Sequence, residues 1–587
     1  MKHSDVDCLL ELSWEVCNKV GGIYTVITSK ADLMKRGFKE YYLVGPYTSK
    51  ADDFSPEETP SHLQAAFDAL SKEGVHCHFG TWRIKGEPHV ILLDFSGIIE
   101  RKNDLKRQYW ESFKIDSIRA GWDFEEPMLW STAAGRLAEE ISKALPKVSL
   151  HCHEWMSGFA ILHVKTAKAK VATVFTTHAT MLGRAIAGSN QDLYAMLPTL
   201  NVDEMAYSLG VESKHQTERA CAQASDIFTT VSEITGTESE KILGRKPDVL
   251  LHNGLDIDKF PTIEDTSIKH IAAREFIREF ITYHFFPYYH FELGHNLSYF
   301  ILARYEFRNK GLDIFIQALG RLNERLKAEH SKRTISAFFW IPANHSGLKT
   351  EFLENKNFLR HIKHLVESEK EEIVERIVTS IVAQEKLSVP AILSEEMFER
   401  LKQNAQHFRR QGDPPLSTHH LDEQHDQMAV ACRQAGLNNK EEDRVKIIIY
   451  PVYLDGSDGL LNLSAEDALT GCHLGVFPSY YEPWGYTPLE SAAYGVPSVT
   501  TDLTGFGRFI APHADKGGIF VVNRMGRPQE QVIEELAAIL YEFAQLDHKG
   551  RVRNKQAAKE LSALADWAKL IQNYLMAHSL AIAKVHA

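Results

Sequence analysis

The sequence predicts an α/β protein in which two doubly wound domains face a cleft. Short apolar runs that read as buried strands alternate with segments of helical spacing, and this alternation occurs in two separate parts of the chain. The chain has 587 residues, which is too long for a single hydrophobic core. Because ligands of such sheets bind at the carboxyl ends of the strands, we expect the active site between the two sheets.

The first alternating part is assigned to an N-terminal domain of residues 1–265. Its predicted strands lie in DCLLELSWEV, EYYLVGPY, HVILLDF, VSLHCHEW and VATVFTTH. Between two of them, WSTAAGRLAEEISKAL shows helical spacing, and DIFTTVS and VLLHNGLD continue the pattern. We expect a C-terminal helix, residues 560–587, to complete this domain.

The second alternating part is assigned to residues 298–560. Its predicted strands lie in SYFILARYE, TISAFFWIPA, VKIIIYPVYL, HLGVFPSYY and PSVTTD. Residues 350–440 differ in composition and periodicity, because they are charged, have a helical period and contain few glycines. They predict a helical insertion, which is either a solvated charged surface or a contact between subunits.

Composition narrows the class of protein. The net charge of -12 argues against a nucleic-acid-binding protein, and no apolar run approaches the length of a membrane span. The start of the chain has acidic residues where a signal peptide would have a basic and then an apolar region. The seven cysteines contain no C-x-x-C pair, which favours reduced thiols in the cytoplasm over disulfides or a zinc site.

The stretch SYYEPWGYTPLESAAYGVP reads as the end of a strand, a loop and a helix. Thr487, Pro488 and Glu490 fit the N-cap, the first turn and the third position of that helix, which is the spacing of a capping box. The helix start also suits a phosphate, and Gly485 lets a ligand approach the backbone. Glu482 would then face the cleft, where a carboxylate can accept from sugar hydroxyls or stabilise positive charge.

Two other segments offer glycine or cation chemistry. Gly21 and Gly22 lie between a strand and a helix, where a glycine turn can cradle a pyrophosphate and Lys19 can supply charge. Arg304 and Lys310 follow the first strand of the second domain and could neutralise a leaving diphosphate. An ordinary tight turn and exposed basic residues at a helix start are the alternatives.

A fourth segment, FTTHATMLGR, ends a strand in His178 and continues to Arg184. A single histidine is more often structural than catalytic. The four segments carry more weight together, because each lies at the carboxyl end of a predicted strand, two in each sheet. Their glycines, cations and carboxylates suit a nucleotide sugar.

These segments resemble the glycogen (starch) synthases of the animal and fungal type, which are retaining glycosyltransferases with the GT-B fold. The resemblance rests on EVCNKVGGIYTVITSKA, HCHEWMSG, FTTHATMLGR, TVSEITGTE, LHNGLDIDKF, RYEFRNKGLDIFIQAL and GCHLGVFPSYYEPWGYTPLESAAYGVPSVTTDLTGFG. The bacterial-type synthases, which use ADP-glucose, have K-T-G-G-L at the first loop. They also space the arginine and lysine one residue closer than Arg304 and Lys310.

The resemblance implies transfer of glucose from UDP-glucose to the non-reducing end of glycogen or another α-1,4-glucan, with retention of configuration. Glu482 would contact the donor glucose, and Arg304 and Lys310 would stabilise the leaving diphosphate. His178 and Arg184 would position the transferring sugar. The implied donor-binding residues are Lys19, Gly21, Gly22, Asn253, Trp484, Gly485, Tyr486, Thr487 and Glu490, with Glu490 at the ribose.

The resemblance also implies that no metal or other cofactor is needed, since two fixed cations take the place of one. The D-x-D at residues 256–258 is then a structural turn. The family forms tetramers through helices of the insertion, so we expect a homo-oligomer, most simply a homo-tetramer. Attack by Glu482 and reaction of leaving group and acceptor on one face both remain open as mechanisms.

Two departures from the family pattern affect these expectations. Where relatives carry an aromatic residue that stacks on the nucleotide base, this chain has Ser464 and Ala465. The preference between UDP-glucose and ADP-glucose as donor is therefore undecided. Relatives also carry a dense arginine cluster on a late helix that senses glucose-6-phosphate, whereas this chain has Arg551 and Arg553 plus lysines. We therefore expect weak or absent activation by glucose-6-phosphate.

Three alternatives remain at this stage. One is another GT-B transferase that uses ADP-glucose or a small sugar acceptor. Another is a phosphorylase, which would need pyridoxal phosphate on a lysine. The third is a non-catalytic glucan-binding paralogue, although Glu482, Arg304, Lys310 and His178 are all present.

Overall fold

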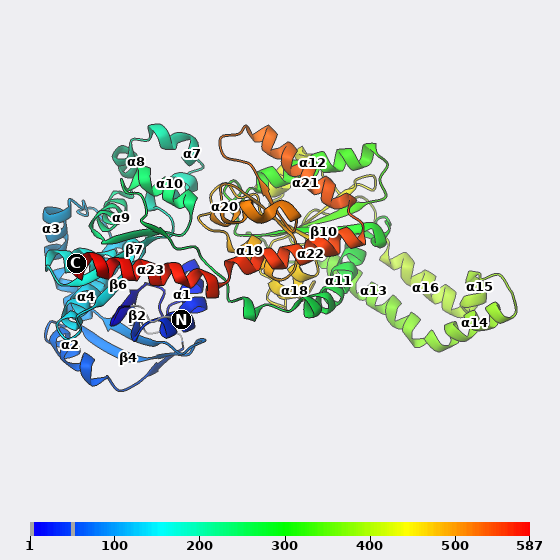
Figure 1. The fold of residues 1–587 in the computed structure, drawn as a ribbon. Helices are drawn as coiled ribbons and strands as arrows, with labels where there is room; N and C mark the ends of the chain where they lie inside the picture. Colours follow the sequence, from blue (N-terminus) through cyan, green and yellow to red (C-terminus); the bar gives the residue numbers. More distant parts are fainter. Residues whose placement is uncertain (1–4, 49–52, 587) are drawn as a thin grey trace.

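The computed structural model describes residues 5–48 and 53–586 of the chain. Two α/β domains lie side by side, and a slender helical arm projects from the second one (Figure 1). The first four residues, part of the start that predicts no signal peptide, lie outside the described residues. No described helix is both long and apolar enough to cross a membrane.

Within the described residues, the N-terminal domain is built on one nine-stranded sheet of order β3-β4-β5-β2-β1-β6-β7-β8-β9. The pairs of β4 with β3 and with β5 are antiparallel, and the other neighbours are parallel. The strands are β1 (Cys8–Leu12), β2 (Glu40–Pro46), β3 (Phe54–Pro56), β4 (His76–Trp82), β5 (His89–Asp94), β6 (Val148–His153), β7 (Val171–Thr177), β8 (Ile227–Thr230) and β9 (Val249–Leu250).

The second domain is built on a sheet whose described strands number six, all parallel, in the order β12-β11-β10-β13-β14-β15. These are β10 (Asn296–Leu302), β11 (Thr334–Trp340), β12 (Val445–Tyr450), β13 (Leu474–Val476), β14 (Ser498–Thr501) and β15 (Ile519–Val522). Their runs are apolar because helices cover both faces of a parallel sheet. The predicted fold class, two parallel-sheet α/β domains, is confirmed.

The helices flank the two sheets. Those of the N-terminal domain are α1 (Gly22–Gly37), α2 (Ser61–Lys72), α3 (Lys102–Phe113), α4 (Trp122–Ser142), α5 (Glu154–Thr166), α6 (Met181–Gly188), α7 (Leu193–Met196), α8 (Val202–Ser208), α9 (Glu212–Ala224) and α10 (Glu233–Ile242). Those that follow, outside the arm, are α11 (Ile263–Phe285), α12 (Leu312–Ala328), α17 (Gln427–Gln434), α18 (Ala465–Thr470), α19 (Tyr486–Ala493), α20 (Gly505–Ile510), α21 (Gln529–Gln545), α22 (His548–Ser562) and α23 (Trp567–His586).

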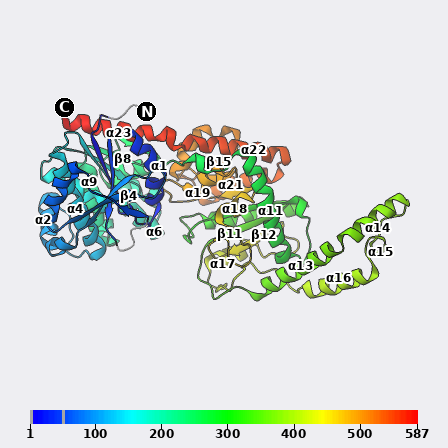
Figure 2. The same ribbon diagram turned by 90° about the horizontal axis from the view of Figure 1, so that it is seen from below.

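The helical arm consists of α13 (Thr350–Ser368), α14 (Lys370–Val382), α15 (Val389–Ile392) and α16 (Glu395–Phe408). It points away from both sheets in two perpendicular views (Figures 1 and 2). The arm ends earlier than the insertion predicted over 350–440. Helix α17 packs against α12 instead, because its buried Met428, Ala429 and Cys432 belong to the core of the second domain.

The last helix, α23, returns from the second domain to the first and lies along the N-terminal domain (Figure 1). It packs against β7 and α1. Its buried residues include Trp567, Leu570, Ile571 and Tyr574, which recur at the spacing of one helix face. Trp567 is 1% exposed, and its Nε1 donates to Ser29 Oγ of α1 at 2.7 Å.

We predict that Trp567→Ala destabilises the protein strongly. The change removes a buried indole and leaves a cavity, which costs about 3–5 kcal/mol of the free energy of unfolding. Urea unfolding followed by fluorescence and circular dichroism measures this loss. Met576→Ala on the same helix is the control, since Met576 is 47% exposed. Equal unfolding midpoints for the two variants would contradict the packing described here.

Candidate functional site

A cavity of about 600 Å³ lies at the carboxyl ends of the strands in the second domain. Ligand pockets commonly measure about 300–1,000 Å³, so this volume suits a nucleotide sugar. Its lining comes from the loops after β10, β11, β12 and β13 and from the start of α19. Four of the predicted site residues line it: Arg304, Lys310, Glu482 and Thr487.

Lys310 and Glu482 form an ion pair in this cavity, between Nζ and Oε2. The two loops that carry them are held together by their backbones, since the carbonyl of Asn309 accepts from the amide of Tyr480 at 2.8 Å. Gly311 permits this approach. It has φ of 71°, and a Cβ there would lie 2.1 Å from the carbonyl oxygen of Pro478.

Arg304 lies at the edge of the same cavity. Its side chain is 80% exposed and pairs with Glu306 Oε1 at 2.9 Å. Exposed ion pairs contribute little free energy, so the guanidinium can exchange this partner for an anionic ligand. The structure thus brings together the two cations and the carboxylate that the sequence predicted at this sheet edge.

Helix α19 begins earlier than predicted, and the predicted capping box is wrong. The helix starts at Tyr486, its N-cap is Gly485 with φ of 105°, and no side chain caps it. A glycine in the left-handed region lets the chain enter the helix before Thr487 is reached. Thr487 therefore lines the cavity instead of capping, and the first amides of α19 are left for a ligand such as phosphate.

Trp484 lies outside the lining of the cavity. It is 3% exposed and packs between the two domains. Its ring centroid lies 5.5 Å from that of His252, which follows β9, and 6.0 Å from that of Phe506 of α20. Trp484 thus contributes to the contact between the domains.

Tyr486 and Glu490 lie on α19 but also outside the lining of the cavity. The hydroxyl of Tyr486 is enclosed and has no hydrogen-bond partner in the described part of the chain. Burial raises the pKa of Glu490, and the negative charge of Glu466 raises it further. The role at the ribose, implied for Glu490 by the resemblance, stays a prediction.

On the side of the N-terminal domain, His178 begins the loop between β7 and α6. Three buried carboxylates hold this loop by accepting from its backbone amides at 2.8–3.2 Å. Glu154 accepts from the amides of His178 and Ala179. Glu238 accepts from the amide of Thr180, and Glu218 accepts from the amide of Met181. Glu154 starts α5 with φ of 65°, a conformation that few residues other than glycine adopt.

Arg184 follows on α6 beside this acidic group. Burial opposes its charge, but Glu154, Glu218 and Glu238 raise its pKa. Burial in turn raises the pKa of each carboxyl, that of Glu238 to about 7. The hydroxyl of Tyr481, from the second domain, donates to Glu238 at 3.2 Å, so this group also joins the two domains.

The glycine turn before α1 is in contact with a side chain of the protein itself. The carboxylate of Glu15 folds back onto the start of α1, where its Oε2 accepts from the amides of Gly21 and Tyr24 at 2.8 Å each. A pyrophosphate would compete with this carboxylate for the same amides, so the turn is not a free cradle in this structure. Gly22 has no atom near its missing Cβ, and Lys19 Nζ lies 5.8 Å from the ring of Tyr24.

Asn253 lies in the loop after β9, directly after His252, whose ring contacts Trp484. It is 4% exposed, and its Oδ1 has no partner in the described residues. The D-x-D at residues 256–258 lies just beyond. Asp256 pairs with Lys85 at 2.6 Å, which agrees with a structural turn.

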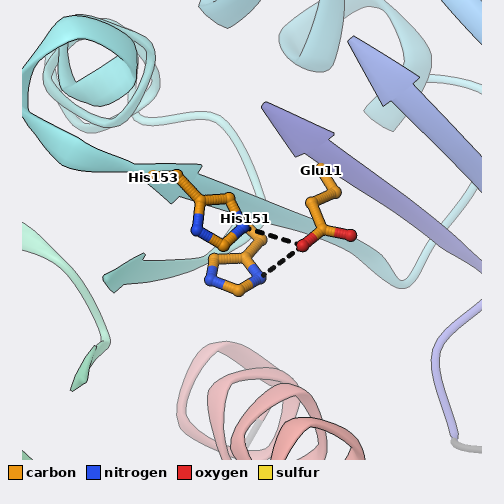
Figure 3. A group of neighbouring side chains, drawn as sticks. All are labelled: Glu11, His151 and His153. Carbon is orange, nitrogen blue, oxygen red and sulfur yellow. Dashed lines mark hydrogen bonds and ion pairs between the residues drawn. The ribbon is translucent and has the colours of Figure 1, made fainter. Parts of the chain in front are cut away.

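One buried group, Glu11, His151 and His153, has the residue types of a metal site, with ligand atoms within 4.8 Å of one another (Figure 3). However, Lys30 Nζ is bonded to the same Oε1 of Glu11 that faces the histidines. A cation is therefore already present at the shared oxygen, and the group is better described as a charge network.

A charge from another helix lies near the arginines and lysines that the sequence predicted on the late helix α22. Arg274 of α11 and Lys555 lie close enough to Arg551 for their charges to affect one another. Burial lowers the pKa of His270 to about 3, and Lys555, Arg274 and Arg551 lower it further. Arg553 is exposed. The premise of the glucose-6-phosphate prediction was thus incomplete, and the prediction itself stays untested.

Sequence reasoning missed several residues of the cavity, of which Tyr453 is the most prominent. It lies in the loop after β12 and is 77% exposed. No ring contact or hydrogen bond engages it within the described part of the chain. The predicted strand VKIIIYPVYL included Tyr453, but β12 ends at Tyr450, which leaves Tyr453 in the loop at the carboxyl edge of the sheet.

Two facing α/β domains with a charged cavity at the strand ends of one of them are typical of glycosyltransferases with the GT-B fold. The catalytic domain of Starch Synthase IV from Arabidopsis thaliana, bound to ADP and acarbose, shares this fold with a TM-score of 0.51. It is 13% identical and is matched over 99% of this chain and 100% of that chain. The family profile described as glycogen synthase matches residues 11–587.

Relatives named Glycogen [starch] synthase are similar along nearly the whole chain. Those of Caenorhabditis elegans and Mus musculus (liver) are each 36% identical over 98% of this chain, which is 88% and 83% of their own lengths. That of Dictyostelium discoideum is also 36% identical over 98% of this chain and is covered over 66% of its length. The chain therefore belongs to the glycogen synthase family and is a glycosyltransferase of glycogen synthesis.

We predict that Glu482→Gln lowers the rate of glucan elongation by roughly 10²–10³-fold, the usual effect of removing one electrostatic group from an active site. The amide keeps the size of the side chain but removes the negative charge that faces Lys310. Incorporation of labelled glucose into glycogen measures the rate. Glu530→Gln is the control, because it removes an exposed partner of Arg321, and neither residue lines the cavity. Equal rates for both variants would contradict the site.

We predict that Glu238 makes stability fall as pH rises. Its pKa of about 7 in the folded protein lies above the ordinary value of 4.5, so between these values the unfolded chain loses the proton first. Glu238→Gln should therefore gain on the order of 2 kcal/mol relative to the parent between pH 5 and pH 8. Urea unfolding at both pH values tests this, with exposed Glu240→Gln as control. Parallel pH curves for parent and Glu238→Gln would contradict it.

Proposed function

We propose that the protein transfers glucose from UDP-glucose to the non-reducing 4-hydroxyl of an α-1,4-glucan, with retention of configuration. The observation that carries this proposal is the Lys310–Glu482 pair, which lies beside the uncapped start of α19 in one cavity. Cations and free helix amides suit a diphosphate, and a carboxylate beside them suits the hydroxyls of the attached sugar.

Arg304 and Lys310 neutralise the diphosphate as it leaves, together with the amides of α19 and the hydroxyl of Thr487. With these fixed groups the reaction needs no metal and no other cofactor. Glu482 contacts the donor glucose. Its ion pair with Lys310 reduces its nucleophilicity, which favours reaction of leaving group and acceptor on the same face over attack by Glu482.

His178 and Arg184 act from the other domain on the transferring sugar. They lie on the loop and helix that the three buried carboxylates hold. The contacts of Trp484 with His252 and of Tyr481 with Glu238 already join the domains around the cleft. Further closure on the bound donor excludes water and so prevents hydrolysis.

Tyr453 supplies the stacking platform for the nucleotide base. Its exposed ring and the small side chain of Ala465 line the same cavity, so the ring offers an aromatic face on which the base can lie. A ring that stacks without hydrogen bonds tolerates uracil and adenine, which supports some use of ADP-glucose beside UDP-glucose.

We predict that Tyr453→Ala weakens UDP binding by about 1–3 kcal/mol, the cost of losing one base stack. Tyr453→Phe keeps the ring and should bind as the parent does. Isothermal titration with UDP measures both. Trp110→Ala, which removes a half-exposed ring of the N-terminal domain, is the control. Unchanged affinity of Tyr453→Ala would place the base elsewhere.

The decisive experiment measures glucose transfer by purified protein to glycogen, with UDP-glucose and ADP-glucose in parallel. Maltooligosaccharides and monosaccharides are compared as acceptors. Faster transfer from UDP-glucose to the glucans supports the proposal. Faster transfer from ADP-glucose would change the proposed donor, and faster transfer to a small sugar would change the proposed acceptor. No transfer from either donor would favour a glucan-binding protein without activity.

Assembly, location and regulation complete the proposal. We expect a cytoplasmic homo-tetramer joined through the arm, where Val374, Val378 and Ile381 are exposed apolar residues of α14. Analytical ultracentrifugation gives the assembly state. Weak or absent activation by glucose-6-phosphate stays a prediction, and strong activation in a dose series would contradict it.

A further inference from the structure

A buried row of charged and polar side chains leads through the N-terminal domain to His178. Lys30 Nζ is paired with Glu11 Oε1, and the same oxygen is 2.7 Å from His153 Nε2. His153 Nδ1 in turn lies 2.9 Å from His178 Nε2. Lys30 and Glu11 are fully buried, and His153 and His178 are 1% and 7% exposed.

The row determines which nitrogen of each histidine carries a proton. Burial would raise the pKa of Glu11, but Lys30 and His153 hold it well below its ordinary value, so the carboxylate is ionised and can only accept. His153 must therefore carry a proton on Nε2. Burial lowers the pKa of His153, which is neutral and so has a lone pair on Nδ1.

That lone pair accepts from His178, which places the proton of His178 on Nε2. Burial lowers the pKa of His178 well below its ordinary value, and the positive charges of Lys30 and Arg184 act in the same direction, so this ring is also neutral. Its Nδ1 is then an acceptor. Within the described residues no group donates to it.

We propose that Glu11 and His153 are positioning residues that hold His178 as the neutral tautomer protonated on Nε2. His178 lies at the carboxyl end of β7, on the edge of the sheet that faces the cleft, and its free Nδ1 accepts a hydrogen bond from a hydroxyl of the transferring sugar. The sugar as ligand rests on the proposed function, whereas the tautomer follows from the row alone.

The surroundings of the row support this role. Tyr41 donates to the other oxygen of Glu11, Oε2, at 2.5 Å and so leaves Oε1 to Lys30 and His153. His151 Nε2 is engaged by the hydroxyl of Thr176 at 2.7 Å. The remaining titratable and charged groups packed against the row are Tyr574 and His578 of α23 beside Lys30 and His151, and Glu154 and Arg184 beside His178.

The first test is the double variant Glu11→Gln with Lys30→Met. It removes both buried charges together, so neither is left unpaired. An amide can donate as well as accept, so in the variant residue 11 no longer determines which ring nitrogen of His153, and hence of His178, carries the proton. We expect kcat for transfer to fall roughly 10–100-fold, as for other residues that orient a histidine in an active site. The dissociation constant for UDP should change less than twofold, because UDP contacts the other domain.

Tyr41→Phe is the matched control, since it removes a hydrogen bond to Glu11 in the same buried cluster without touching Oε1. It should keep kcat within about twofold of the parent. A structural role alone would lower the thermal midpoint and weaken UDP binding together with kcat in both variants. An unchanged kcat in a folded double variant would overturn the proposal.

The second test reads the tautomer directly and does not depend on activity. Nitrogen-15 spectra of histidine-labelled parent protein distinguish protonated from unprotonated ring nitrogens, and the His178→Gln spectrum identifies the signal of His178. In the parent protein we expect His178 to be protonated on Nε2. In the double variant we expect a mixture of the two tautomers of His178. If that variant does not fold, His153→Gln should show the same mixture, because its amide can donate to or accept from His178. Protonation of His178 on Nδ1 in the parent protein would overturn the proposal. Absence of transfer with the expected tautomer would instead count against the proposed function.

Discussion

The loop from Ser479 to Thr487 is the part of the chain on which the rest of the site depends, because it belongs to the cavity and to the domain contact at once. Glu482 and Thr487 line the cavity. Between them, the carbonyl of Pro483 accepts from Ser232 of the N-terminal domain at 2.7 Å. The pairing of Lys310 with Glu482 is therefore coupled mechanically to the distance between the domains. A movement that opens the cleft must also shift the carboxylate or break these contacts.

The two domains use buried charge in opposite ways. In the N-terminal domain, buried carboxylates are satisfied by backbone amides and by Lys30, and they hold His178 in place without meeting the ligand. In the second domain, Arg304 and the start of α19 have weak partners or none, so they remain available for an anion. Desolvation is costly for unpaired charge, which explains why the fully buried charges are structural and the exposed ones face the cavity.

Local sequence was sufficient where the interaction itself is local. Glu482, Arg304 and Lys310 were found because each follows an apolar run that reads as a buried strand, and parallel strands end at one edge. The start of α19 was missed because both Thr487 and Gly485 can begin a helix, and only the loop packing selected Gly485. The contact of Glu15 with the amide of Gly21 was not predicted, since no local pattern shows that Glu15 folds back onto it.

The sequence by itself determined the two sheets, the edge at which the chemistry lies and the charged residues of the cavity, because period and composition are properties of neighbouring residues. Only the tertiary structure decided which residues share the site. In the structure Trp484 lies in the contact between the domains, Tyr453 lines the same cavity as Ala465, and Glu11 is hydrogen-bonded through His153 to His178. Most of these contacts join residues far apart in the chain, and they arise from the packing of strands and domains, which no local pattern encodes.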